Sequence, residues 1–382
     1  MIVAARRLVV TGNGGTGDGE AIDGAAIDGP GWLAIENGVV VSAHRGRAPH
    51  PHVELGTVVP GFVDIHSHGA LGHDVGSADA PALTAIADFH ARSGTTSLVA
   101  SIATAPLDAL AASIRSLLPS VQNGTIAGIH LEGPYLSAER RGAHNPALLR
   151  DPALPEIRAL VETGQGAVRM ITIAPELSGA EQSIRWLAAN GVTVAIGHSD
   201  ADAATAAAAF GWGATVVTHL FNGMRPLHHR EPGIIGAALI DDRVTVELIL
   251  DGQHVRAEAA EIVRRAAPGR LALVSDSMAA TGCGDGDYEV AGSAVRVRDG
   301  VATLVHGDSL AGSTATVSIG FGLLAAAGVP LADAVAITSA TPSRALGLPV
   351  PLAVGSRADL LELDDDGAVQ RVMRRGEWLA SS

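Results

Sequence analysis

The sequence predicts an α/β fold: a (β/α)8 TIM barrel together with a small β-sandwich domain formed from both chain ends. Eight apolar runs between residues 58 and 278 alternate with Ala-rich or amphipathic segments of helical length, as in a parallel sheet covered by helices. Nearly every run ends in polar residues, and barrel enzymes place their chemistry at these carboxyl ends of strands. The two chain ends carry short strand and turn patterns instead. We assign residues 58–346 to the barrel and residues 1–57 and 347–382 to the β-sandwich.

The N-terminal part of the β-sandwich is predicted from two apolar runs, Met1–Val10 and Trp32–Ser42. Asn37-Gly38 within the second run is a strong signal for a two-residue β-hairpin. The segment Thr11–Gly31 between the runs is rich in Gly and Asp, so we expect a surface loop there.

Three glycines in this loop, Gly12, Gly14 and Gly17, match the dinucleotide fingerprint G-x-G-x-x-G after a strand. The fingerprint requires a helix whose N-terminus holds the pyrophosphate. The following residues, GDGEAIDGAAIDGPG, cannot open such a helix. We therefore expect no dinucleotide site.

The barrel strands are predicted from the eight apolar runs, which are too continuous to be the half-exposed strands of an antiparallel sheet. The runs are VVPGFVDIH, TTSLVASIAT, TIAGIHLEG, VRMITIAPE, TVAIGHSD, ATVVTHLFN, TVELILDGQH and LALVSDSM. The helices expected between them are Pro81–Arg92, Leu107–Leu118, Pro155–Thr163, Ala180–Asn190, Ala201–Phe210 and Ala257–Ala267. Eight repeats in about 220 residues favour a closed barrel over an open doubly wound sheet.

A β-hairpin insertion is predicted near residues 287–306, after the eighth run. Its strands are Tyr288–Val297 and Val301–Val305, with a turn at Asp299-Gly300. A last helix is expected over Leu331–Leu346.

The C-terminal strands of the β-sandwich are predicted at Asp359–Leu363 and Val369–Leu379. The acidic run at residues 364–367 between them is interpreted as a solvated turn. Because both chain ends show short apolar runs separated by turn residues, we expect them to pair in one domain.

The charges limit the possible functions. The 382 residues include 26 Arg, no Lys and 40 acidic residues, for a formal charge of −14. The absence of Lys excludes a Schiff base, a P-loop phosphate lysine and a carboxylated-lysine metal bridge. The acidic balance argues against nucleic acid or an anionic membrane as a partner. The single cysteine, Cys283, cannot form a disulfide within the chain, and no apolar stretch reaches the about 20 residues of a membrane span. Both observations favour a cytoplasmic protein.

Polar residues with metal-ligand chemistry follow the predicted barrel strands. His66 and His68 end the first strand, and alternate residues of a strand face the same side. Alone, this pair could be two buried, hydrogen-bonded histidines. The other strand ends favour a divalent metal site; they carry Glu132, His198, His219 and Asp276. His130 has the same parity as Glu132, and we expect it to pack behind the ligands.

A metal at these residues would lower the pKa of a bound water to about 7 and polarise a carbonyl group. Asp276 then suits the general base that takes the water proton and returns it to a leaving amine. Such a donor set accepts Zn, Fe, Mn or Co, of which we favour zinc. One or two ions per subunit are compatible with it.

Eight motifs follow one another between about residues 58 and 345: PGFVDIHSHG, HLEGPYLS, RRGAHN, GHSDA, THLFNGMRPLHHREPG, DGQHV, SDSMAATG and LAGSTAT. Together they resemble the N-acetylglucosamine-6-phosphate deacetylases of the amidohydrolase superfamily. The resemblance implies that Glu132, His198 and His219 hold the principal metal. It also implies that Asp276 is catalytic. Many members lack the histidines corresponding to His66 and His68, so their presence implies a second ion, bridged by Glu132.

The resemblance also implies the substrate contacts, which are Ala143, His144, Asn222, Gly223, Arg230, Asp251, His254, Leu310, Ala311 and Gly312. It further implies a homodimer in which Arg230, His254 or both reach the neighbouring subunit's site. Gly223 is a departure, because Ala is common at that position, but a backbone contact would survive the change. The alternatives are a basic surface loop for Arg230 and an ordinary helix-start histidine for His254. Cys283 is interpreted as an incidental thiol.

The function that the resemblance implies is metal-dependent hydrolysis of N-acetyl-D-glucosamine 6-phosphate to D-glucosamine 6-phosphate and acetate. A guanidinium such as that of Arg230 suits a phosphate group. One alternative is another amidohydrolase reaction, on a related amino-sugar phosphate or a cyclic amide. Another is a metal-free barrel that acts as an interaction scaffold. This alternative is disfavoured because each predicted ligand position carries a residue that can bind a metal.

Overall fold

The computed structural model describes residues 1–11, 26–307 and 309–380, which divide into two compact units. One unit comprises residues 1–64, 90–97 and 317–382, and the other comprises residues 65–89 and 98–316. The glycine fingerprint at Gly12, Gly14 and Gly17 lies outside the described residues. No helix in the described ranges is long and apolar enough to cross a membrane.

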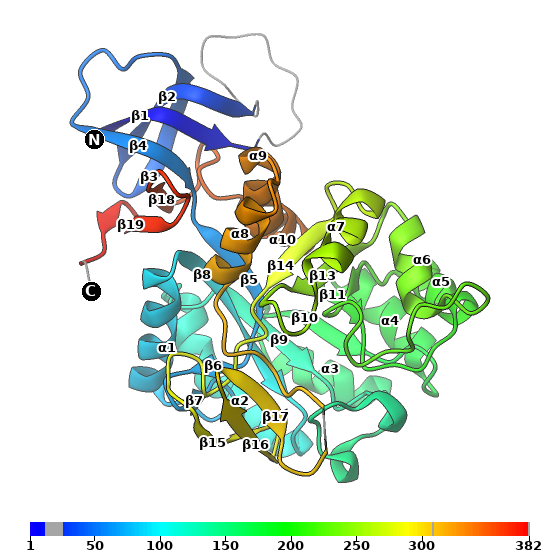
Figure 1. Ribbon diagram of the computed structural model, residues 1–382. Helices are drawn as coiled ribbons and strands as arrows, with labels where there is room; N and C mark the ends of the chain where they lie inside the picture. The colour runs from blue at the N-terminus through cyan, green and yellow to red at the C-terminus, as the bar shows by residue number, and fades with distance from the viewer. Residues whose placement is uncertain (12–25, 308, 381–382) are drawn as a thin grey trace. The chain divides into compact units, whose positions relative to one another are not determined.

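The barrel is an eight-stranded sheet in which the strands follow chain order from β5 to β14 (Figure 1). Its strands are β5 (Phe62–Ser67), β8 (Thr95–Ala103), β9 (Gly128–Glu132), β10 (Val168–Ile173), β11 (Thr193–Ile196), β12 (Val216–Val217), β13 (Thr245–Ile249) and β14 (Leu271–Val274). The ladders from β8 to β14 are parallel. All eight predicted strands are therefore confirmed.

The first and last barrel strands are joined at their carboxyl ends. Ser67 and Ser277 form a parallel bridge. The Asp276 N–H donates to the His66 carbonyl oxygen at 2.9 Å, and the His68 N–H donates to the Ser277 carbonyl oxygen at 2.7 Å. This closure brings two distant segments together at the end of the barrel that carries the predicted ligands.

The helices lie outside the barrel strands in Figure 1. They are α1 (Ala80–Arg92), α2 (Leu107–Gln122), α3 (Leu154–Thr163), α4 (Ala180–Ala189), α5 (Ala203–Trp212), α6 (Gly233–Ile240), α7 (Ala257–Ala266), α8 (Val317–Ala326), α9 (Leu331–Val335) and α10 (Thr341–Ala345). Short 3-10 turns cover Ala138–Arg140 and Pro146–Leu148. In α2, Leu110, Ile114 and Leu117 are buried at helical spacing, so one face packs and the other is solvated.

Two helices were not predicted, α6 and α8. Their sequences, GIIGAALI and VSIGFGLLAA, carry no charged residue and therefore show no amphipathic period. The last predicted helix is also interrupted, because a π-helical turn at Ala336–Ala340 separates α9 from α10.

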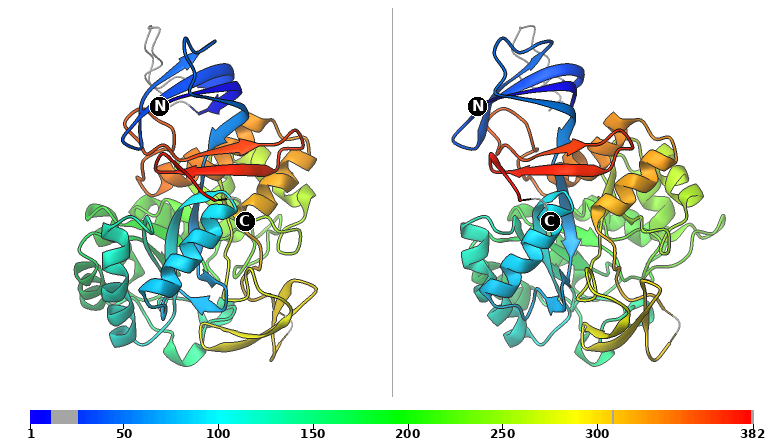
Figure 2. Two further views of the ribbon diagram at one scale, coloured as in Figure 1. Left: turned by 90° about the vertical axis from the view of Figure 1, so that its left-hand side faces the viewer. Right: turned by 60° about the vertical axis from the view of Figure 1, so that its left-hand side comes forward.

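The two chain ends form one seven-stranded sheet with the order β20-β19-β18-β4-β1-β2-β3. Its strands are β1 (Ile2–Val10), β2 (Ile27–Glu36), β3 (Val39–Arg45), β4 (Val53–Pro60), β18 (Leu360–Leu363), β19 (Val369–Arg374) and β20 (Glu377–Trp378). Figure 2 shows the N-terminal strands in blue and the C-terminal strands in red. The sheet folds over one apolar core, since Leu33 and Val40 share a cluster with Leu360 and Met373.

Local sequence explains the ends of these strands. The predicted hairpin at Asn37-Gly38 is confirmed, with φ of 50° and 75°. β2 begins earlier than expected, so residues 27–31 of the predicted loop belong to a strand.

The first apolar run divides at Gly61 between β4 and β5. A Cβ at Gly61 would lie 2.1 Å from Thr96 Oγ1, so only glycine fits this close approach.

The insertion after the eighth barrel strand is a three-stranded antiparallel sheet, not a simple hairpin. Its strands are β15 (Gly286–Val290), β16 (Ser293–Arg298) and β17 (Val301–Leu304). The predicted first strand is broken by a turn at Ala291-Gly292, where both residues have positive φ. Val290 and Ala311 belong to one buried cluster with Met278, which follows β14. A two-stranded ribbon, β6 (Gly69–Ala70) with β7 (His73–Asp74), follows β5.

Candidate active site

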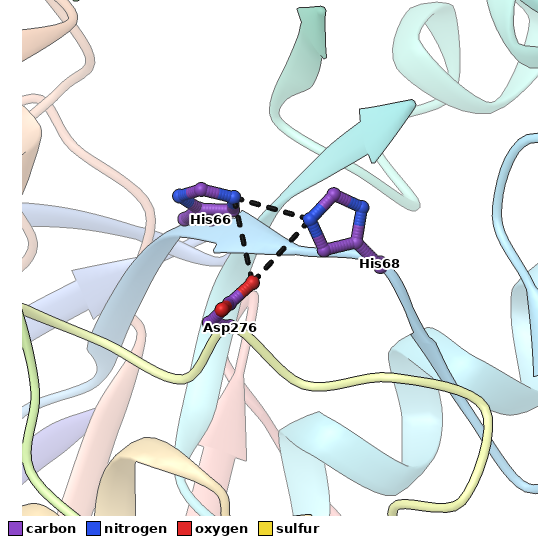
Figure 3. Close-up of side chains that lie close together, drawn as sticks. All are labelled: His66, His68 and Asp276. Atoms are coloured by element: carbon purple, nitrogen blue, oxygen red, sulfur yellow. Dashed lines mark hydrogen bonds and ion pairs between the residues drawn. The ribbon is translucent and has the colours of Figure 1, made fainter. Parts of the chain in front are cut away.

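His66, His68 and Asp276 form one cluster of possible metal ligands (Figure 3). His66 and His68 come from the end of β5, and Asp276 follows β14. The His66 and His68 Nε2 atoms are 3.1 Å apart. Asp276 Oδ1 lies 3.5 Å from His66 Nε2 and 3.3 Å from His68 Nε2. All three side chains are buried.

Glu132, His198 and His219 form a second cluster of possible ligands. Glu132 ends β9, and the two histidines follow β11 and β12. Glu132 Oε1 lies 3.1 Å from His198 Nε2 and 3.1 Å from His219 Nε2. The two Nε2 atoms are themselves 3.1 Å apart.

The Glu132 carboxylate joins the two clusters. Its Oε1 lies 3.4 Å from His66 Nε2, and its Oε2 lies 3.1 Å from His68 Nε2. One carboxylate thus approaches the Nε2 atoms of all four candidate ligand histidines. The ligand atoms of both clusters converge around it.

Hydrogen bonds at the opposite ring nitrogens orient two of the imidazoles. His198 Nδ1 lies 2.9 Å from the Arg140 carbonyl oxygen, which can only accept. His66 Nδ1 lies 3.1 Å from Glu247 Oε2. Both rings therefore carry the proton on Nδ1 and turn an Nε2 lone pair toward the clusters, as metal-binding histidines do.

His144 is oriented in the opposite sense. The Thr104 backbone N–H donates to His144 Nδ1 at 3.4 Å, so Nδ1 must be unprotonated. Burial is the main cause that lowers the pKa of His144, to about 4, so the ring is neutral at pH 7. Its proton then lies on Nε2, which is 3.2 Å from Glu132 Oε2. His144 thus presents a hydrogen-bond donor beside the clusters.

His130 does not join the ligands. Its Nδ1 contacts Ser101 Oγ at 2.9 Å and its Nε2 contacts Thr172 Oγ1 at 2.8 Å. The ring packs edge-on against His66, with centroids 4.7 Å apart. It supports the His66 ring from behind.

Three of the ligand residues have left-handed backbone conformations: His198 with φ of 47°, His219 with φ of 28° and Asp276 with φ of 47°. This conformation costs a residue with a Cβ roughly 1–2 kcal/mol. Strain of this kind persists only where the surrounding structure holds it, and it is common at functional sites.

The carboxylates and imidazoles of the two clusters shift one another's pKa values, each favouring the charged form of the other. Burial by itself lowers the pKa of His68, but the Asp276 and Glu132 carboxylates outweigh it and raise that pKa to about 10. Burial raises the pKa of Asp276, but His66 and His68 outweigh it and lower that pKa to about 2. The histidines hold the pKa of Glu132 well below its usual range in the same way.

A divalent metal fits these residues. The six ligand atoms are imidazole nitrogens and carboxylate oxygens, which are the donors that Zn, Fe, Mn and Co accept. A dication would supply the positive charge that the buried carboxylates attract and would replace protons on the imidazoles. The chain has no lysine that could do so.

The clusters lie in the floor of a cleft of about 390 Å³. Residues from several loops and strand ends line it; among them are Arg140, Gly142, Phe221, Met224, Ile249, Val290 and Ser309. The cleft gives a small polar molecule access to Glu132 and Asp276.

Comparison with known proteins places this cleft in a family. The profile of the amidohydrolase family matches residues 57–379. The chain is 34% identical to N-acetylglucosamine-6-phosphate deacetylase of Vibrio furnissii, over 89% of this chain and 88% of that protein. It is 36% identical to N-acetylgalactosamine-6-phosphate deacetylase of Escherichia coli O157:H7, over 91% and 95% of the two chains. The chain belongs to the N-acetylglucosamine-6-phosphate deacetylase family of amidohydrolases.

A solved structure is similar to this amidohydrolase over almost its whole length. It is an aspartate-to-alanine variant of N-acetyl-D-glucosamine-6-phosphate deacetylase from Mycobacterium smegmatis, in complex with N-acetyl-D-glucosamine 6-phosphate. The TM-score is 0.92 at 43% identity, covering 99% of this chain and 98% of the other.

Most of the substrate residues expected in this amidohydrolase line the cleft of their own chain. They are Ala143, His144, Asn222, Gly223, His254, Leu310, Ala311 and Gly312. Two expected residues do not line it. Arg230 is exposed, and its Nη1 contacts His229 Nε2 at 2.8 Å. Asp251 lies behind His254 instead of in the cleft.

Asp251 holds His254 in place. Its Oδ2 accepts from His254 Nδ1 at 2.7 Å and from Ser313 Oγ at 2.8 Å. Burial raises the pKa of Asp251, but His254 outweighs it and holds that pKa below its usual range. These contacts make Asp251 a positioning residue for His254, and the substrate contact expected of it stays a prediction.

Two residues of the site were missed in the sequence. Arg140 lines the cleft, and its guanidinium pairs with Asp200 at 2.8 Å. Arg140 begins the motif RRGAHN, in which only Ala143 and His144 were predicted to contact the substrate. Glu247 is completely buried against His66. A single carboxylate within the apolar run TVELIL was the signal that could have revealed it.

Proposed function

We propose that this amidohydrolase hydrolyses the acetamide of N-acetyl-D-glucosamine 6-phosphate to D-glucosamine 6-phosphate and acetate. The observation that carries the proposal is the Glu132 carboxylate, which lies within 3.4 Å of the Nε2 atoms of four candidate ligand histidines and of His144. The 43% identical enzyme from Mycobacterium smegmatis, seen with this sugar phosphate, supports the substrate.

We propose two divalent ions, with zinc favoured, held by His66, His68 and Asp276 and by Glu132, His198 and His219, with Glu132 shared. Such an ion supplies Lewis acidity, which lowers the pKa of a bound water and polarises a carbonyl group. Asp276 is the general base: its ionised carboxylate accepts the proton of the attacking water and then delivers it to the departing amine.

His144 is proposed to stabilise the oxygen of the amide as negative charge develops there. Its Nε2–H lies at the cluster edge, and the neutral ring donates without a change of protonation. A positioned donor of this kind typically contributes about 10²–10³-fold to the rate. Asp276 and His144 thus act on opposite ends of the breaking bond.

The phosphate is proposed to bind at the outer part of the cleft, with His254 and backbone groups at residues 310–312 positioning the sugar. Arg230 does not line the cleft of its own chain, so its proposed phosphate contact requires a homodimer in which it reaches the partner's site. A cytoplasmic location remains an expectation from the sequence.

The test of the reaction is a deacetylation assay with four sugars: N-acetylglucosamine, N-acetylgalactosamine and their 6-phosphates. Metal content is measured on the same sample. We expect the highest kcat/KM for N-acetylglucosamine 6-phosphate and loss of activity on chelation. The Escherichia coli relative favours a second candidate, the N-acetylgalactosamine 6-phosphate reaction. A higher kcat/KM for that sugar would replace our assignment.

The homodimer is tested by complementation between two impaired variants, assayed at a substrate concentration below the raised KM of Arg230→Ala. Arg230→Ala lacks the phosphate contact, and Asp276→Asn lacks the general base. In a mixed dimer, the site with Asp276 intact receives Arg230 from its partner, so mixing the variants should restore activity toward the phosphorylated sugar. Activity no higher than the sum of the separate variants would contradict a contact across subunits.

Arg230→Ala alone should mainly raise KM for N-acetylglucosamine 6-phosphate, because a distal contact made equally in ground and transition states acts on binding. N-acetylglucosamine without the phosphate should respond little. Equal fractional losses of kcat/KM for both sugars would show that Arg230 is structural.

A further inference from the structure

We infer that Glu247, a residue outside both ligand clusters, is a positioning residue that sets the metal affinity of the His66, His68 and Asp276 cluster. Glu247 lies in the middle of β13 and is completely buried. Burying a carboxylate in an apolar strand is costly unless it is hydrogen-bonded. Its contacts therefore indicate what it does. The inference rests on the proposed metal-dependent function.

Glu247 fixes the protonation of the His66 ring. Its Oε2 lies 3.1 Å from His66 Nδ1. Because a carboxylate accepts, Nδ1 carries the proton and Nε2 keeps its lone pair toward the cluster. A carboxylate behind a metal-binding imidazole also makes that imidazole a stronger ligand. His66 thus depends on Glu247 for both its orientation and its donor strength.

Glu247 also holds the turn that carries His219. The same Oε2 accepts from the His219 backbone N–H at 3.3 Å, and the Glu247 carbonyl oxygen accepts from the Leu220 N–H at 2.8 Å. His219 has a φ of 28°, so these two bonds hold a strained backbone. One residue on β13 therefore connects a ligand of each cluster.

The two contacts of Glu247 differ in kind. The His66 contact is to a side chain that reaches the cluster directly. The His219 contact is to its backbone and leaves the His219 ring untouched. We therefore expect loss of the charge at Glu247 to weaken the His66 cluster more than the Glu132, His198 and His219 cluster.

The experiment is a Zn²⁺ titration of the apoprotein against a chromophoric chelator, on wild type and Glu247→Gln. Gln keeps the shape and can still accept a hydrogen bond, but lacks the charge. Loss of such a supporting group typically lowers metal affinity about 10–100-fold. We expect that loss for one ion and less than a roughly three-fold change for the other. Glu362→Gln, which removes a buried carboxylate bonded to Gly56 N–H in the other unit, should bind Zn²⁺ as wild type does.

A double-mutant cycle separates positioning from general damage. If Glu247 acts through His66, then Glu247→Gln should change Zn²⁺ affinity little in a His66→Asn background. Additive losses would overturn the inference. So would wild-type affinity for both ions in Glu247→Gln.

A measurement on the wild type covers the case in which Glu247→Gln does not fold. Histidine ¹⁵N NMR of the zinc-loaded protein should show His66 protonated on Nδ1, and a proton on Nε2 would overturn the inference. A wild type that binds Zn²⁺ but fails to deacetylate the phosphosugar would contradict the proposed function, while the Zn²⁺ titrations would still decide the role of Glu247.

Discussion

Replacing Asp276 with Asn removes the proposed general base while keeping the size of the side chain. The backbone tolerates this change, because Asp276 has a φ of 47° and Asn is among the residues that adopt the left-handed region most readily. Its backbone bonds to the His66 carbonyl oxygen and the Ser313 N–H do not involve the side chain. We therefore expect Asp276→Asn to fold like the wild type.

The size of the effect follows from the place of the carboxylate. Asp276 lines the cleft and is buried there, 3.3 Å from His68 Nε2. Loss of a positioned general acid–base group lowers the rate by about 10²–10⁴-fold. At about 1.36 kcal/mol for each factor of ten, the barrier rises by about 2.7–5.4 kcal/mol. The change in KM should stay below roughly three-fold, because the interaction acts in the transition state.

The assay measures kcat and KM for N-acetylglucosamine 6-phosphate, with metal content and thermal unfolding determined on the same samples. Asp359→Asn is the matched control: it also neutralises a buried aspartate, one that accepts the Arg375 backbone N–H in the sheet of the chain ends. It should keep the wild-type kcat. If Asp276→Asn keeps its metal and more than about a tenth of the wild-type kcat, the general acid–base role is refuted.

Three further outcomes are expected. Glu132→Gln should lower metal content, measured by elemental analysis, more than His66→Asn does, because Glu132 contacts both clusters; full occupancy in Glu132→Gln would contradict its shared role. Asp251→Asn should raise KM with little loss of metal, because it loosens the His254 ring and touches no ligand; steady-state kinetics with parallel metal analysis checks this. Phe62→Ala should destabilise the protein by about 3–5 kcal/mol, seen as a lower urea midpoint, because the ring is fully buried against Phe321 at 4.9 Å; an unchanged midpoint would contradict it.

Much of the barrel could be predicted because its strands are buried on both faces. Such strands are continuous apolar runs, which local sequence displays directly. The α2 helix could be predicted from its amphipathic pattern, because its buried residues recur with the helical period and the residues between them are solvated. The α6 and α8 helices were missed because their sequences are apolar all round, and a helix of this kind has no period to detect.

The six candidate ligand positions were also visible in the sequence. In a parallel barrel, consecutive strand ends meet at one rim, so His66, Glu132 and Asp276 can be placed together from strand order alone. Residues that act from behind the ligands could not be assigned in this way. The sequence placed Asp251 among the substrate contacts, and only the tertiary structure shows that its carboxylate holds the ring of His254, which lines the cleft.

The sequence by itself therefore determined the strand order, the donor types and the absence of lysine, since each is a property of local composition and spacing. Tertiary structure decided which nitrogen of each imidazole faces the clusters, because that depends on a partner distant in the chain: Glu247 for His66, Arg140 for His198 and Thr104 for His144. Hydrogen-bond partners across 181, 58 and 40 residues leave no periodic trace in the sequence. They form only when the barrel closes and brings a Glu247 carboxylate oxygen, the Arg140 carbonyl oxygen and the Thr104 backbone N–H within 3.5 Å of these rings.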